Sequence, residues 1–171
     1  LLPYNFNIFI MALEGKKIFV SADCKTITGD FAVGSSPDTV LIKDSSGASV
    51  TVASGDLTYG GGKVSFAKTH SAAFVGVLQV IAQNSSLVAL ASAYSVATCK
   101  ISCCIAALLK EALECSCACD QCKKDLMRAE KVQLFLQAAI YEAEHNANLT
   151  QAEKNYNKAS ELCIEVCACG C

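Results

Sequence analysis

The sequence has few of the residues on which common catalytic and nucleic-acid-binding sites depend. It contains no tryptophan and two histidines among 171 residues. Its 14 Lys and Arg form no basic block and are balanced by 16 Asp and Glu, which argues against a nucleic-acid or acidic-membrane binder. A histidine-based enzyme would have to use His70 or His145, and neither has a partner motif. We therefore expect no catalytic residues and no enzymatic activity.

Long hydrophobic runs are also missing. No apolar stretch reaches the about 20 residues that a membrane-spanning helix needs. The most apolar stretch, residues 87–96, is interrupted by Ser92, Tyr94 and Ser95. Hydrophobic residues nevertheless make up 53% of the chain and charged residues 18%, so the chain can fill a core. The sequence predicts one ordinary domain or two small ones, without a membrane span.

The first ten residues are apolar and uncharged, and they precede Met11. They lack the basic start and the small-residue cleavage site of a signal peptide. We expect residues 1–14 to form an arm that buries Phe6, Ile8 and Phe9 against a neighbour. The alternative is a weakly structured leader ahead of a natural start at Met11.

The pattern over residues 15–98 predicts a β-domain. The expected strands are residues 17–21, 39–43, 49–53, 63–66, 74–82 and 87–98. Turn residues at 44–47 join the second and third of these strands into a hairpin. The last two predict a long hairpin, with a helix as the competing interpretation because alanines are frequent. Six or more short strands at this spacing predict an immunoglobulin-like β-sandwich.

The pattern becomes helical near Cys103, and residues 99–171 predict a second domain. The expected helices are residues 104–113, 120–145 and 150–166. Thr150 and Glu153 have the spacing of a capping box at the start of the third helix. The short connection at 146–148 makes the last two helices antiparallel neighbours. The predicted fold class is therefore α+β, an N-terminal immunoglobulin-like β-sandwich followed by a Cys-rich antiparallel helical hairpin.

Cysteine is the residue in excess, with 12 copies placed unevenly. Cys24 stands alone, and we expect it to be a buried apolar residue without a partner. The disulfide candidates are Cys99, Cys103, Cys104, Cys115, Cys117, Cys119, Cys122, Cys163, Cys167, Cys169 and Cys171. Antiparallel helices of roughly 35 Å and 25 Å would bring residues 115–122 close to residues 167–171.

Two chemistries fit such a cysteine cluster. Disulfides that hold the helical hairpin closed are favoured, ahead of a metal site and of reduced packing cysteines. A zinc site would use Cys119, Cys122, Cys167 and Cys169. Their spacing is not that of a zinc ribbon, so we expect no cofactor, with zinc as the alternative. For Cys99, Cys103 and Cys104, a bridge from the β-domain to the helices is favoured over simple packing.

The order of these parts resembles a known group of proteins. A β-domain ends in a long hairpin, followed by the Cys-Cys helix start at 103–109, the polar turn at 143–153 and the Cys-x-Cys-Gly-Cys ending at 167–171. Over residues 35–171 this layout resembles small cysteine-rich proteins encoded among the virion and tail genes of tailed phages that infect Bacteroidetes, including crAss-like phages.

The resemblance implies a non-catalytic virion structural protein, a tail or neck component assembled in the host cytoplasm. Its partners would be other copies of itself and other virion proteins, with no nucleic acid. A reducing cytoplasm would favour metal binding or late oxidation of the thiols. Two other functions stay open. One is a secreted or surface-attached, disulfide-stabilised binding module, which would be extracellular; the other is a thiol-based metal-binding or redox protein.

Overall fold

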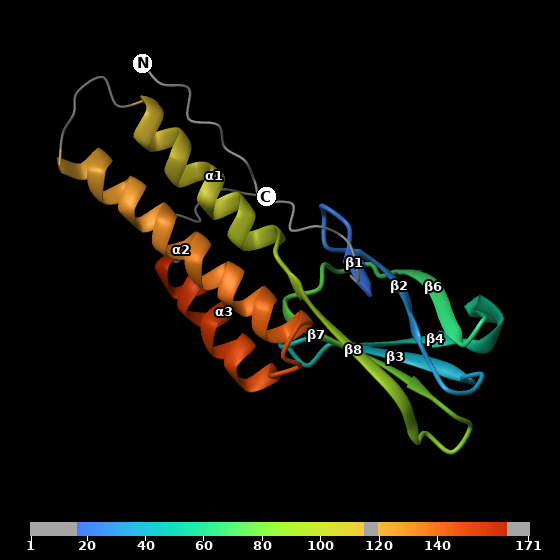
Figure 1. Cartoon of the computed structure of the whole chain (residues 1–171). Helices are drawn as coiled ribbons and strands as arrows, with labels where there is room; N and C mark the ends of the chain where they lie inside the picture. Colours follow the sequence, from blue (N-terminus) through green and yellow to red (C-terminus); the bar gives the residue numbers. More distant parts are fainter. Residues whose placement is uncertain (1–16, 115–119, 164–171) are drawn as a thin grey trace.

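A computed structural model of the chain describes residues 17–114 and 120–163. Strands occupy the first part of this region and helices the second (Figure 1). The described residues form two antiparallel four-stranded sheets and three α-helices, so the α+β class is confirmed. The N-terminal arm predicted over residues 1–14, with Phe6, Ile8 and Phe9, lies outside the described residues.

The first sheet has the strand order β1-β2-β6-β5. Its strands are β1 (Ile18–Val20), β2 (Thr26–Ala32), β5 (Thr58–Gly60) and β6 (Lys63–Thr69). The sequence did not predict β2, which contains the strand-disfavouring Gly29 and Asp30. Gly29 pairs with Phe66 across the sheet, and a Cβ at Gly29 would collide with the Phe66 ring. The glycine is therefore part of the strand, because the ring occupies the space of its missing side chain.

The second sheet has the order β4-β3-β7-β8. Its strands are β3 (Thr39–Lys43), β4 (Ser49–Ala53), β7 (Gly76–Gln83) and β8 (Ala89–Ala97). The pairings of β3 with β4 and of β7 with β8 confirm both predicted hairpins, and the helical alternative for β8 is wrong. A short 3-10 turn, η1 (Ser54–Asp56), leads from β4 toward β5.

Residues from both sheets fill one hydrophobic core. The first sheet contributes Ile27 and Val64, and the second contributes Ile42 and Leu78, all fully buried. The strands β7 and β8 also face the helices with their other side. For this reason Val77 and Val96 belong to a second core that the helices fill.

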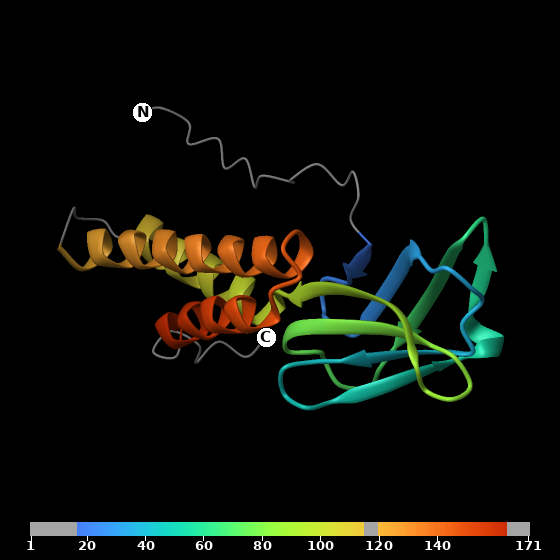
Figure 2. The same ribbon diagram turned by 60° about the horizontal axis from the view of Figure 1, so that its bottom comes forward.

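The helices are α1 (Cys99–Glu114), α2 (Asp120–Glu144) and α3 (Leu149–Cys163). They run side by side away from one end of the sheets (Figure 2). α1 starts five residues before the predicted position 104, directly after β8, and its Ile101 and Leu108 are buried against α2 and α3. The helical part is thus a three-helix unit rather than a hairpin alone. None of these helices combines the length and hydropathy of a bilayer span.

The start of α3 differs from the predicted capping box. The helix begins at Leu149, and the Asn148 Oδ1 atom accepts a hydrogen bond of 3.2 Å from the Gln151 backbone N–H. Asn148 is therefore the N-cap, two residues before the predicted Thr150. The prediction was wrong because it rested only on the Thr-x-x-Glu spacing. In the structure the Glu153 side chain contacts Ser45 of the β3–β4 turn, so it does not serve as the second residue of a capping box.

Candidate functional site

The described residues with distinctive chemistry gather where the sheets meet the helices. Two groups lie there: a disulfide between the β1–β2 turn and α1, and a set of polar contacts that join β3, β7 and β8 to α2 and α3. A third feature, an exposed apolar face of α2, lies on the side away from the core. The disulfide and the polar contacts join residues far apart in the sequence, whereas the apolar face lies within one helix.

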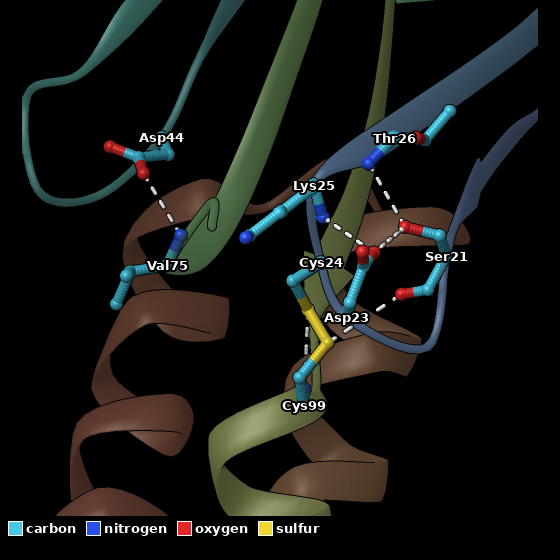
Figure 3. Close-up of a disulfide and its surroundings, with 8 residues drawn as sticks. All are labelled: Ser21, Asp23, Cys24, Lys25, Thr26, Asp44, Val75 and Cys99. Carbon is cyan, nitrogen blue, oxygen red and sulfur yellow. Dashed lines mark hydrogen bonds between the residues drawn. A yellow bond between two sulfur atoms is a disulfide. The ribbon is translucent and has the colours of Figure 1, made fainter. Parts of the chain in front are cut away.

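The disulfide between Cys24 and Cys99 ties the β1–β2 turn to the first residue of α1 (Figure 3). The two Cα atoms are 6.0 Å apart, a usual separation for a bridge. The Cys99 backbone N–H also donates to the Cys24 sulfur at 3.4 Å. Cys24 is buried, as predicted, but the expectation that it has no partner is wrong. Cys99 makes a bridge from the β-strands to the helices.

Side chains of the β1–β2 turn hold Cys24 in position. The Ser21 hydroxyl and the Lys25 backbone N–H both donate to the Asp23 carboxylate, and the Ser21 oxygen accepts from the Thr26 N–H at 2.9 Å. These bonds from Ser21 and then Lys25 lower the pKa of Asp23 below its ordinary value. With these bonds in place, Cys24 takes a left-handed backbone conformation, with φ of 56°, that aims its sulfur at α1.

The second disulfide joins Cys104 of α1 to Cys163, the last residue of α3, with Cα atoms 5.8 Å apart. Both cysteines are buried in the helical core. Next to Cys104, the half-buried Cys103 is the one free cysteine in the described part of the chain. Cys122 of α2 is buried and is also disulfide-bonded.

The remaining disulfide candidates lie outside the described residues: Cys115, Cys117, Cys119, Cys167, Cys169 and Cys171. The predicted meeting of the two cysteine groups therefore stays a prediction. Of the four candidate zinc ligands, Cys122 is described, and a disulfide sulfur is not the thiolate that zinc binds. Within residues 17–114 and 120–163 there is no group of three or more His, Cys, Asp or Glu side chains arranged for a metal ion.

Asp44 organises the turn between β3 and β4. Its Oδ1 atom accepts hydrogen bonds from the Ser46 and Ala48 backbone N–H groups and from the Ser46 hydroxyl, at 2.7–3.0 Å. Its Oδ2 atom accepts from the Val75 N–H at 2.9 Å (Figure 3). One nearly buried carboxylate thus fixes both the turn and the start of β7, because it accepts four hydrogen bonds.

The neighbouring residue, Ser45, connects the sheet to α3. Its hydroxyl accepts from the Val77 N–H at 2.8 Å and lies 3.5 Å from the Glu153 carboxylate of α3. Gly76 approaches the same side chain, and its φ of +75° is a conformation that favours glycine. A Cβ at position 76 would also lie 3.5 Å from the Tyr156 ring of α3. This close packing needs a residue without a side chain at position 76.

A third polar contact joins β8 to α2. The Ser95 side chain is 0% exposed, and its hydroxyl donates to the Glu144 carboxylate at 2.8 Å. A hydrogen bond to a charged acceptor in a buried position is stronger than one at the surface. Ser45, Ser95 and Tyr156 together show that the contact between sheets and helices is specific and not only apolar.

Tyr156 has a raised pKa, first because the phenol is buried, and also because the Asp44 carboxylate is close; the Gly76 N–H works in the opposite direction. A raised pKa in the folded protein favours the protonated phenol. The resulting stability is fully present below the unfolded pKa, and it is lost as the pH rises through the folded pKa.

We expect Tyr156→Phe to lose less of its free energy of unfolding than the wild type as the pH rises above about 10, since phenylalanine does not ionise. The measurement is denaturant unfolding of both proteins at neutral and alkaline pH. The difference between them at neutral pH gives the cost of the missing hydroxyl and serves as the baseline. Parallel pH profiles for the two proteins would contradict the expectation.

The two histidines lie apart from these contacts. His145 follows α2 and stacks on Tyr141, with ring centroids 5.0 Å apart. The His70 Nδ1 atom is 3.0 Å from the Ala72 carbonyl oxygen, within its own turn, and the ring lies 5.7 Å from that of Phe74. Each histidine is thus engaged with neighbours in its own segment.

The outer face of α2 carries three large apolar side chains in a line. Met127, Leu134 and Tyr141 are 57%, 65% and 49% exposed, and each is seven residues from the next. We call these three residues the α2 stripe. The core-facing residues Val132, Leu136 and their neighbours lie on the opposite side of the helix, in the helical core.

Two of these features have a signal in the sequence. Eleven cysteines between Cys99 and Cys171 cannot all pair among themselves, which pointed to Cys24 as a partner. The seven-residue spacing of Met127, Leu134 and Tyr141 in the α2 stripe is also visible in the sequence. The contacts of Ser45, Gly76 and Tyr156 had no such signal.

No known protein family, curated protein or solved structure was found to match this chain.

Proposed function

We propose that the chain is a non-catalytic structural subunit of a tailed-phage virion, at the tail or neck, which contacts other copies and other virion proteins in a symmetric assembly. The observation that carries this proposal is the α2 stripe. Apolar side chains of this size, exposed in a row on the side of a helix away from its core, are typical of a surface that another protein covers.

The connections between the sheets and the helices support the same proposal. A disulfide and two hydrogen bonds, from Ser45 to Glu153 and from Ser95 to Glu144, connect the sheets to the helices, and a second disulfide connects α1 to α3. A subunit in a symmetric assembly must hold its contact surfaces at fixed relative positions. These connections restrict movement between the β-strands and the helical unit. A partner bound to α2 would therefore be held at a fixed position relative to the sheets.

We further propose that the two sheets form an immunoglobulin-like sandwich. The order β1-β2-β6-β5 corresponds to strands A-B-E-D of that fold, and β3-β7-β8 corresponds to C-F-G, with β4 as an additional strand beside C. The core shared by both sheets is consistent with this arrangement. Such domains serve as rigid, non-catalytic modules in many assemblies, so the fold suits the proposed role.

The test is the mass of the full chain in solution, measured by light scattering over a range of concentrations, with negative-stain electron microscopy of the same samples. We expect discrete oligomers that grow with concentration and show one symmetry. A monomer at every concentration would overturn the assembly function.

A second candidate is a secreted or surface-attached binding module. The two disulfides favour it, because structural disulfides are typical of oxidising compartments. The same experiment separates the two candidates. A stable monomer supports the binding module, whereas an ordered oligomer supports the structural subunit.

A further inference from the structure

The α2 stripe has a regular spacing that decides which surface it fits. Met127 lies seven residues before Leu134, and Tyr141 lies seven residues after it. Residues seven apart share one line along a helix, as in coiled coils. Leu134 is therefore the centre of the stripe, with a large apolar side chain about 10.5 Å away in each direction.

The stripe fits the same stripe of a second copy when the two α2 helices run in opposite directions. If a second copy of α2 lies antiparallel with the two Leu134 side chains in contact, each Met127 faces the Tyr141 ring of the other copy. This arrangement has a two-fold axis beside Leu134 and buries all six side chains of the two stripes. A methionine beside an aromatic ring is a favourable pair.

The charges of α2 select the antiparallel direction. Lys123 and Lys124 lie near its beginning, Glu142 and Glu144 lie near its end, and no Lys or Arg follows Lys131 within the helix. With successive residues about 100° apart, Lys124 and Glu142 lie on one side of the stripe, whereas the Glu144 carboxylate is turned toward β8, where it accepts a hydrogen bond from Ser95. In an antiparallel pair the same sides meet, so Lys124 of each copy comes close to Glu142 of the other copy. A parallel pair would place lysine beside lysine.

The other acidic residues in the first half of α2 do not oppose this arrangement. In the antiparallel pair, Glu130 of one copy lies at the height of Ala138 of the other copy. Asp120 of one copy lies beyond the last residue of α2 in the other copy. Asp125 is buried on the core side. The macrodipoles of two antiparallel helices also attract one another.

We propose that two copies of this chain associate through α2, antiparallel and about a two-fold axis at Leu134. This inference rests on the proposed assembly function and names one of its interfaces. The apolar stripe supplies the buried centre of the contact, and the two pairs between Lys124 of one copy and Glu142 of the other flank it and set its direction.

The first test is Leu134→Glu in the full chain, with dimer dissociation measured by sedimentation equilibrium. Two glutamates would meet at the axis in an apolar contact, so we expect dimerisation to weaken about a hundredfold or more. The fold should persist because Leu134 is 65% exposed, and circular dichroism checks this. The control is Leu113→Glu, which changes a leucine of α1 that is 82% exposed and lies outside the stripe. It should dimerise as the wild type does.

The second test exchanges charges. Lys124→Glu and Glu142→Lys should each weaken the dimer about tenfold, because each places like charges together twice. The double variant restores opposite charges and should recover the wild-type dissociation constant. Single variants without effect, or a double variant worse than either, would overturn the antiparallel register.

The outcomes separate this inference from the assembly function. An oligomer of the wild type that Leu134→Glu leaves intact overturns the α2 interface and leaves the assembly function standing. A wild type that is monomeric at every concentration overturns both. A dimer that depends on Leu134 but never grows supports the interface and counts against a role in a larger virion assembly.

Discussion

The variant in which Cys24 and Cys99 are both replaced by alanine should lose about 4 kcal/mol of its free energy of unfolding. The two cysteines are 75 residues apart in the sequence, so their bridge removes a large part of the conformational freedom of the unfolded chain. The bridge also anchors β1, a strand of three residues at the edge of its sheet. Denaturant unfolding measures the loss.

The control for this experiment is Cys103→Ala. Cys103 lies in the same helix, four residues after Cys99, and is free and half-buried. We expect its replacement to change the free energy of unfolding by less than about 1 kcal/mol. Replacing both bridged cysteines avoids leaving a new free thiol that could pair elsewhere. If the double variant and Cys103→Ala unfold at the same denaturant concentration, the bridge does not stabilise the protein.

Gly76→Ala should be the second severe change, with a loss of about 3 kcal/mol. An alanine at this position must keep a φ of +75°, which L-residues rarely adopt. Its Cβ would also lie 2.7 Å from the Ser45 hydroxyl oxygen and 2.8 Å from the Ser45 Cβ atom. Ser45 must therefore shift, which disturbs its hydrogen bonds to Val77 of β7 and Glu153 of α3. Thermal or denaturant unfolding measures this loss.

Gly47→Ala separates the two causes. Gly47 has a similar φ of +87°, but a Cβ there meets no atom within 4 Å. We expect it to cost about 1 kcal/mol, the strain of the backbone alone. The excess loss in Gly76→Ala then reports the collision with Ser45. Equal losses in the two variants would show that the position is limited by its backbone and not by the packing of the sheet on α3.

Much of the β-structure was predictable because local patterns decide it. The runs at 39–43 and 49–53 have the β-branched residues of strands, and the Asp-Ser-Ser-Gly sequence between them forms a turn through the Asp44 side chain. β2 was not predictable in the same way. Gly29 disfavours a strand locally, and only the Phe66 ring on the neighbouring strand explains why a glycine is required there.

Among the helices, too, some bounds were predictable from local patterns and others were not. The apolar spacing in α2 was enough to predict its bounds within one residue. The first helix was predicted to begin five residues late, because the sequence does not show that Cys99 is tied to Cys24 at the point where β8 ends. At α3 two capping residues were possible, Asn148 and Thr150, and the observed hydrogen bond to Gln151 decides for Asn148.

The sequence by itself determined the succession of strands and helices apart from β2 and β5, together with the cysteine enrichment and the apolar faces, since these depend on residues close together in the chain. Tertiary structure alone decided that Cys24 pairs with Cys99, that Cys104 pairs with Cys163, and that Ser45, Ser95 and Tyr156 join the sheets to the helices. The reason is physical: each of these contacts depends on the distance between segments 49 to 108 residues apart, and no local pattern encodes that distance.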